Sequence, residues 1–130
     1  MTHVTQKTFD AVVRIIQPFF TETGWSGGLR SFANLPPLLG WEILDLWPEL
    51  RGDAQNFSPT FAEMLDLADE EGTVDGYVIE FERGDCRVTL DAITVRVDDM
   101  DDFLDLLVGT RPDTADWVDE DRQFLHLWWD

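Results

Sequence analysis

The fold is decided by residues 77–97, which read YVIEFERGDCRVTLDAITVRV. Larger apolar side chains alternate with other residues from Tyr77 to Glu82, and this period of two predicts a β-strand. The segment Arg83–Asp85 has turn-forming residues, and Arg87–Val97 predicts a second strand. The alternation changes face near Asp91, which indicates a local break such as a β-bulge. These strands predict a small, mostly antiparallel sheet.

Three helices are predicted on the N-terminal side of these strands. Apolar residues recur every three or four positions in residues 9–20 and again in 39–47, which predicts two helices. Ser58 is followed by a proline, and this pair predicts the N-cap and first turn of a third helix that ends before Gly72. The stretch 29–37 is predicted to be irregular, because two consecutive prolines break any helix there.

One further helix and a last strand are predicted on the C-terminal side. Asp98 and Asp99 can cap a helix that stops near Gly109. Its apolar side is expected to be formed by Met100, Phe103, Leu104, Leu107 and Val108. An acidic loop over 113–121 should then lead into a strand over 124–129. The order of elements predicts one α+β domain over residues 1–130, with three N-terminal helices, a small sheet and one further helix before the last strand.

Negative charge is concentrated in the second half of the chain. The formal net charge is −18, and residues 1–60 carry six acidic and four basic side chains, whereas residues 61–130 carry twenty-one acidic and five basic ones. Self-repulsion opposes compaction, so the charge indicates solubility, salt adaptation or a cationic partner. A bias of the whole genome would affect both halves equally. The nearly neutral first half therefore favours a cationic partner.

The candidate partner-binding residues lie between 98 and 121, where ten acidic residues accompany only Arg111. Carboxylates arranged in this way can steer a basic protein, or can resemble the phosphates of nucleic acid. Tryptophan is enriched at binding hot spots, so the tryptophan of this stretch is the expected anchor. The predicted set is Asp98, Asp99, Asp101, Asp102, Asp105, Asp116, Trp117, Asp119, Glu120 and Asp121. A solvated helix end and loop would explain the same charges without a partner.

No catalytic, cofactor or metal motif is found in the sequence. It contains no Gly-x-Ser-x-Gly, Walker-type, Rossmann or zinc signature, so no cofactor is predicted. The acidic run from Asp99 has Thr110 where an EF-hand loop needs its twelfth-position glutamate. His126 has no partner at ligand spacing and alternates with leucines, so it is expected to be a half-buried structural residue. Cys86 is expected to be a small buried side chain rather than a nucleophile.

These observations predict a non-enzymatic inhibitory or immunity-type protein, which blocks a basic toxin or nuclease through its acidic C-terminal surface. One alternative is a DNA mimic from a phage or mobile element, which would occupy the groove of a DNA-binding protein. A second is an ordinary domain of a salt-adapted or GC-rich organism. A third is a small metal-dependent hydrolase that uses some of the many carboxylates.

The protein is expected to be soluble and cytoplasmic. Its single cysteine cannot form an intramolecular disulfide, and the N-terminus lacks the pattern of a signal peptide. No apolar run approaches the roughly 18 residues of a membrane span. Direct binding of nucleic acid or of a membrane is not expected, because both carry negative charge.

Overall fold

The computed structural model describes residues 4–54 and 57–129 and has an α+β fold with an antiparallel sheet, as predicted. The sheet has five strands. The strands are β1 Leu29–Leu35, β2 Thr73–Ile79, β3 Arg87–Arg96, β4 Thr114–Trp117 and β5 Phe124–Trp128. The helices are α1 Gln6–Ile16, α2 Pro37–Leu46, α3 Phe61–Ala68 and α4 Met100–Thr110, with the 3-10 turns η1 Gln17–Phe19 and η2 Pro48–Gly52. The strand order is β1-β2-β3-β5-β4.

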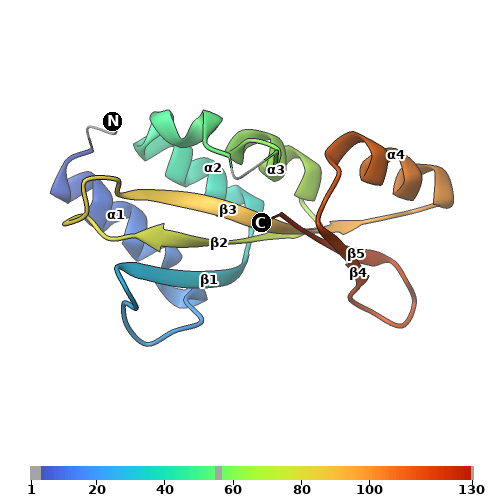
Figure 1. Ribbon diagram of the computed structural model, residues 1–130, viewed down its shortest axis with the longest axis horizontal. Coiled ribbons are helices and arrows are strands. Elements are labelled where there is room, and N and C mark those ends of the chain that lie inside the picture. The colour runs from blue at the N-terminus through green and yellow to red at the C-terminus, as the bar shows by residue number, and fades with distance from the viewer. Residues whose placement is uncertain (1–3, 55–56, 130) are drawn as a thin grey trace.

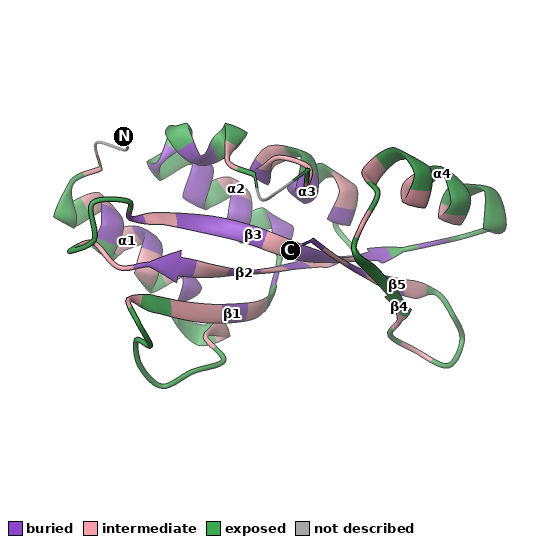
Figure 2. Ribbon diagram, in the orientation of Figure 1, coloured by how far each residue is buried: buried purple, intermediate pink, exposed green. Residues whose placement is uncertain are grey.

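The core lies between the sheet and the first three helices. Figure 1 shows α1 passing behind β1, β2 and β3, with α4 at the opposite end of the molecule. Buried side chains of α1, α2 and α3 join one cluster with those of the sheet, among them Val12, Ile43, Met64, Val78 and Ile93. By contrast, α4 has no fully buried residue, as the absence of purple from this helix in Figure 2 shows.

The long strand β3 connects the two ends of the sheet. It pairs with β2 over most of its length, while its C-terminal half also pairs with β5. Ala92 lies opposite Asp75 and Leu90 lies opposite Gly76, which leaves Asp91 as an extra residue in β3. This β-bulge confirms the break predicted near Asp91, and it allows apolar residues on both sides of it to face the same core.

Two segments predicted to lack regular structure form the edge strands of the sheet. The stretch 29–37 contains β1, which pairs with β2. Its register shifts between Phe32 and Leu35, where Asn34 has a positive φ of 60°, so the strand has no simple alternation. The predicted loop 113–121 contains β4, a four-residue strand that forms a hairpin with β5. In both cases the pairing with a neighbouring strand outweighs a weak local pattern.

The boundaries of α3 and β2 also differ from the prediction. Thr60, rather than Ser58, caps α3, and its side chain accepts a hydrogen bond from the backbone N–H of Glu63. The Glu63 carboxylate accepts one in return from the Thr60 N–H, which completes a capping box. Strand β2 begins at Thr73 and ends at Ile79, earlier than the alternation from residue 77 suggested.

The predicted apolar side of α4 is only partly correct. Phe103 and Leu107 pack against the core together with Leu106, which the prediction did not include. Three residues predicted to be on the buried side are exposed: Met100, Leu104 and Val108. The helix therefore turns a different face to the sheet, and apolar side chains remain on its outer surface.

Candidate functional site

The predicted partner-binding residues are carried by α4 and the β4–β5 hairpin. Two contacts join these elements to each other. The rings of Phe103 and Trp117 stack with centroids 5.5 Å apart, and the indole Nε1 of Trp129 donates a hydrogen bond of 2.9 Å to the carbonyl oxygen of Thr110. Trp129 is itself part of the buried core. The aromatic residues thus fix the end of α4 to the end of the sheet.

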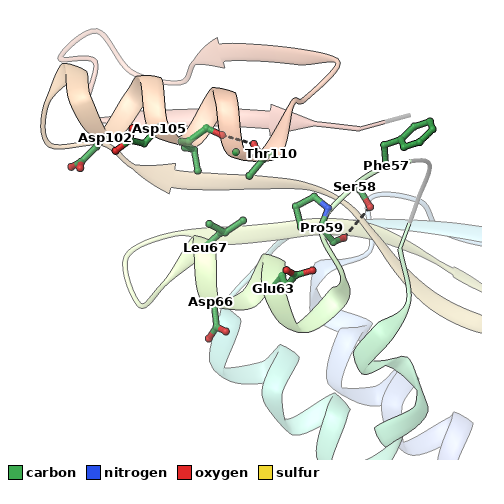
Figure 3. A pocket seen from close by; sticks show the side chains of 11 residues that line it. Phe57, Ser58, Pro59, Glu63, Asp66, Leu67, Asp102, Asp105 and Thr110 are labelled. Atoms are coloured by element: carbon green, nitrogen blue, oxygen red, sulfur yellow. Dashed lines mark hydrogen bonds between the residues drawn. The ribbon is translucent and has the colours of Figure 1, made fainter.

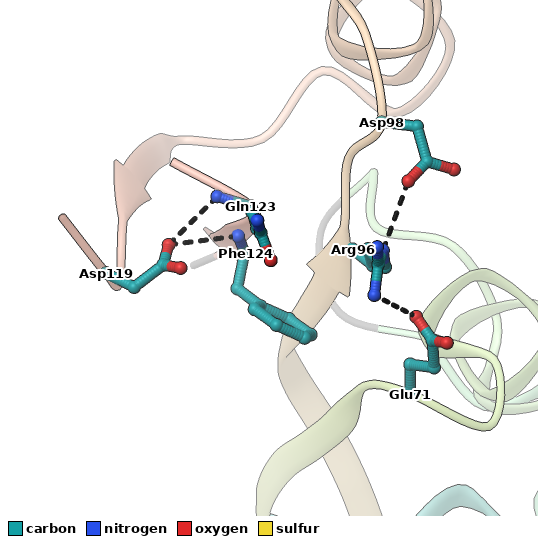
Figure 4. Close-up of polar contacts among 6 residues, drawn as sticks. All are labelled: Glu71, Arg96, Asp98, Asp119, Gln123 and Phe124. Atoms are coloured by element: carbon teal, nitrogen blue, oxygen red, sulfur yellow. Dashed lines mark hydrogen bonds and ion pairs between the residues drawn. The ribbon is translucent and has the colours of Figure 1, made fainter. Parts of the chain in front are cut away.

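Two of the predicted carboxylates stabilise the start of α4. Asp99 is its N-cap, and its Oδ1 accepts a hydrogen bond of 2.8 Å from the Asp102 N–H. Asp98 is paired with Arg96 at 3.1 Å, and the same guanidinium is 3.1 Å from Glu71 in the turn between α3 and β2 (Figure 4). The hydrogen bond to Asp98 and the charges of Glu71 and Asp98 raise the pKa of Arg96. These contacts join α4, β3 and the α3–β2 connection.

Asp119 stabilises the turn of the hairpin. Its Oδ1 accepts hydrogen bonds from the backbone N–H groups of Gln123 and Phe124, at 3.0 and 3.1 Å (Figure 4). A side chain used in this way closes a turn that the strand ladder leaves open. Asp119 therefore has a role in the fold, besides any role in attracting a partner.

The remaining predicted residues are available at the surface to different extents. Six carboxylates are exposed: Asp101, Asp102, Asp105, Asp116, Glu120 and Asp121. Asp116 lies on β4, while Glu120 and Asp121 lie in the turn of the hairpin. Trp117 is half-buried against Phe103, so only part of its ring can reach a partner. The structure thus brings the predicted residues to one end of the molecule but distributes them over several faces.

A groove of about 730 Å³ separates α4 from α3 (Figure 3). Asp102 and Asp105 of α4 line one side, while Glu63 and Asp66 of α3 line the other. Among the described residues that line it, apolar surface comes from Phe57, Pro59, Leu67 and Leu106, and none is Lys or Arg. The groove therefore combines four carboxylates with an apolar surface.

The position of Glu63 is set by the local structure of α3. Its hydrogen bonds with the backbone and side chain of Thr60 lower the pKa of this carboxyl group. Negative charge near the N-terminus of a helix is also favoured by the helix dipole. Glu63 therefore stays ionised under mildly acidic conditions, and the α3 side of the groove keeps this charge.

The α3 side of the groove was missed by the sequence analysis. The sequence signal for Glu63 was present, because Thr60 and Glu63 have the spacing of a capping box. Phe57 and Asp66 carry no comparable signal. Their part in the groove depends on the packing of α3 beside α4, which no local pattern specifies.

A second group of titratable side chains lies across the sheet. His126 Nε2 on β5 is 3.0 Å from Asp75 Oδ2 on β2, although β3 runs between these strands. Ala92 of β3 lies opposite Asp75, and its small side chain leaves room for this contact. The other oxygen of Asp75 accepts a hydrogen bond of 2.9 Å from the Asn34 N–H in β1. Asp75 thus connects three strands, and His126 is half-buried as predicted.

The pKa values of His126 and Asp91 are both raised in this cluster. The hydrogen bond to Asp75 raises the pKa of His126, and the charges of Asp75, Asp116 and Asp91 act in the same direction against the effect of burial. Burial and the charge of Asp75 raise the pKa of Asp91 to about 6. The cluster therefore favours the protonated forms of both His126 and Asp91.

Within residues 4–54 and 57–129, no group of three His, Cys, Asp or Glu side chains is placed to hold a metal ion. No helix in these ranges has both the length and the apolar character needed to cross a membrane. Comparison of the chain with protein-family models, curated proteins and solved structures found no match.

Proposed function

We propose that this protein is a non-enzymatic inhibitor of the immunity type, which binds a basic protein such as a toxin or nuclease and blocks it. The observation that carries this proposal is the groove between α3 and α4, which is lined by four carboxylates from two helices. A surface of one sign attracts a partner of the opposite sign and excludes others. The partner would insert cationic side chains into this groove.

The composition of the groove supports arginine or lysine as the inserted residue. Both side chains have an apolar stem and a charged end. Leu67 and Leu106 can contact the stem, while carboxylates such as Asp66 and Asp102 can pair with the charged end. Arginine can in addition pair with a carboxylate through two parallel hydrogen bonds.

An exposed aromatic side chain lies at one end of the groove (Figure 3). Phe57 lines the groove, yet 99% of its surface is accessible to solvent. Aromatic residues that become buried on association commonly contribute a large part of the binding energy. Phe57 therefore supports the groove as the centre of the interface, with the half-buried Trp117 on the other side of α4 as a second contact.

The proposal places the protein in the cytoplasm, where it would meet its partner before that partner reaches its target. The charge outside the groove, including Glu120 and Asp121 in the hairpin turn, would accelerate the encounter. Such steering weakens as salt screens the charges.

The first test compares three forms of the protein as affinity baits in lysate from the source cells. One is unchanged and one carries Asp66→Asn, Asp102→Asn and Asp105→Asn in the groove. The control carries Asp10→Asn, Glu42→Gln and Asp45→Asn on exposed parts of α1 and α2, which removes the same charge elsewhere. We expect one basic protein to be retained by the unchanged and control forms, with affinity about tenfold lower for the groove variant.

The purified partner then allows the association rate to be measured at several salt concentrations. We expect this rate to fall steeply between low and physiological salt. Equal retention by the groove and control variants, or a rate independent of salt, would contradict the proposal. A captured DNA-binding protein that is neither a toxin nor a nuclease, and is released by added duplex DNA, would instead identify a DNA mimic.

A further inference from the structure

The outer surface of α4 carries an unusual row of apolar side chains. Met100, Leu104 and Val108 are 65%, 49% and 72% exposed. They are spaced four residues apart, so successive members are displaced by only about 40° around the helix and the row extends about 12 Å along it. We call these three residues the outer stripe of α4. A large apolar residue exposed alone needs no explanation, but an ordered row on one helix indicates an interaction surface.

The surroundings of the outer stripe define the chemistry of what could cover it. Asp101 and Asp105 lie within one helical turn of Leu104 and Val108, on the side toward the groove. On the opposite side the helix turns toward Phe103, whose ring stacks on Trp117. The stripe thus has carboxylates along one border and an aromatic pair along the other.

We infer that the outer stripe docks an amphipathic helix of the partner, with an apolar face bordered by Lys or Arg. Apolar residues at a helical spacing match the face of a second helix, as in other cases where one helix packs on another. The cations would pair with Asp101 and Asp105. This inference rests on the proposed function, since it names the part of the basic partner that lies beside the groove.

Charge complementarity selects this occupant over a second copy of the chain. Each molecule has a net charge of −18. A symmetric pair of outer stripes would bring Asp101 and Asp105 close to the same residues of the other copy, and like charges at an interface are unfavourable. A basic helix would instead place cations beside Asp101 and Asp105, so these contacts would be attractive.

The test uses synthetic peptides of about 18 residues, a length that allows one helix to form on binding. The first has leucines at positions that form one helical face and lysines along its borders. The second has the same composition, with the leucines distributed around the helix. Both carry the same charge, so a difference between their dissociation constants reports the apolar contact rather than general attraction to an acidic protein.

Two double variants separate the outer stripe from other exposed apolar surface. Leu104→Gln with Val108→Gln removes most of the stripe. Leu46→Gln with Leu38→Gln is the control on α2, where these leucines are 45% and 71% exposed. All four positions are at the surface, and circular dichroism checks that both variants remain folded. Neither double variant changes Asp101 or Asp105.

We expect the amphipathic peptide to bind the unchanged protein and the α2 control equally, and the stripe variant about tenfold more weakly, as for the loss of one buried apolar side chain. Chemical shift changes should map to α4. Equal binding of both peptides, or an equal loss in both double variants, would overturn the inference. Dimerisation of the unchanged protein, abolished in the stripe variant, would overturn it in favour of a second copy.

A narrower groove variant, with Asp66→Asn and Asp102→Asn only, distinguishes the two proposals, because it leaves Asp101 and Asp105 beside the outer stripe unchanged. If the peptide depends on the groove carboxylates and not on the stripe, the inference fails while the proposed function stands. If the peptide depends on the stripe and the lysate partner is indifferent to the groove, the inference stands while the proposed groove is wrong.

Discussion

Asp91 occupies the bulge of β3, where burial and the charge of Asp75 raise its pKa to about 6 from a reference value of 3.8. Because the folded protein holds this proton more tightly than the unfolded chain, ionisation of Asp91 opposes folding. Below about pH 4, Asp91 is protonated in both the folded and the unfolded state, so it does not affect stability. The free energy of unfolding decreases as the pH rises from about 4 through about 6. Most native carboxylates act in the opposite direction.

His126 extends this trend to higher pH. Its pKa is raised above the reference value of 6.5 by Asp75, with smaller contributions from Asp116 and Asp91. The stabilising charge is fully present below pH 6.5 and is lost as the pH rises through the raised value. Asp91 and His126 therefore both make the folded protein less stable on the alkaline side.

We expect the Asp91→Asn variant to be more stable than the unchanged protein at pH 7, by about 1 to 2 kcal/mol after allowance for solvent screening of a partly exposed carboxylate. The difference should shrink toward pH 4, where Asp91 is protonated in both states. Urea unfolding at several pH values measures it, with Asp45→Asn on α2 as an exposed control. A difference independent of pH would show that the amide acts through packing rather than through charge.

Sequence patterns identified some of these residue roles and missed others. The change of face at Asp91 was visible, because alternation is a local property. The contact between Asp75 and His126 was not, since it joins residues 51 positions apart across an intervening strand. It became evident only from the order of the strands.

Among the four described α-helices, α4 has the weakest attachment to the core, because none of its residues is fully buried. The hydrogen bond from the Trp129 indole to the Thr110 carbonyl holds its C-terminal end at 2.9 Å. The stacking of Phe103 on Trp117 holds its middle. Since α4 forms one side of the groove, these contacts also determine the width of the candidate site.

The Trp129→Phe variant should lose about 2 kcal/mol of stability, because it removes one hydrogen bond and leaves a cavity in the core. We expect the backbone amides of α4 to exchange with solvent faster in this variant, with little change in α3. Hydrogen exchange followed by NMR measures both helices at once. Trp128→Phe, at the half-exposed neighbour, is the control and should have a smaller effect. Unchanged exchange in α4 would show that Trp129 does not hold the helix.

The elements were predictable where a helical or strand pattern is regular, as in α1, α3 and β3. Strands β1 and β4 were missed because each is short, lies at an edge and depends on its partner. For α4 the range and the Asp99 cap were correct, but the buried face was only partly correct. Its apolar residues occupy more than one side of the helix, so periodicity could not decide which side the sheet covers.

The net charge of −18 dominates the electrostatic interactions of the molecule as a whole. Ion pairs such as Arg96 with Glu71 and Arg83 with Asp85 would be weakened by salt, but exposed pairs contribute little. Repulsion among the excess carboxylates is the larger effect. Salt should therefore stabilise this protein.

We expect the urea midpoint of unfolding to rise as NaCl is increased from about 0.01 M to about 1 M, over which the screening length falls from about 30 Å to about 3 Å. A variant with Glu120→Gln and Asp121→Asn in the hairpin turn has less repulsion and should respond less. A midpoint that falls with salt would mean that the ion pairs outweigh the repulsion.

At this scale the residues that the sequence singled out lie at one end of the molecule (Figure 1), and they include only one side of the groove. The charge between Asp98 and Asp121 is local in the chain, so the acidic residues of α4 and of the segment 113–121 could be identified together. Asp98, Asp99 and Asp119 proved to have structural roles as well. Glu63 and Asp66 come from a helix more than thirty residues earlier, and only the packing of α3 beside α4 brings them in.

The two edge strands of the sheet affect how readily one molecule can pair with another through its β-strands. At one margin, β4 has only four residues, with the charged Asp116 among them; at the other, β1 is interrupted near Asn34. A straight, uncharged margin is a template on which further chains can polymerise into fibrils. Neither strand offers such a template, so the addition of further strands at either edge of the sheet is disfavoured.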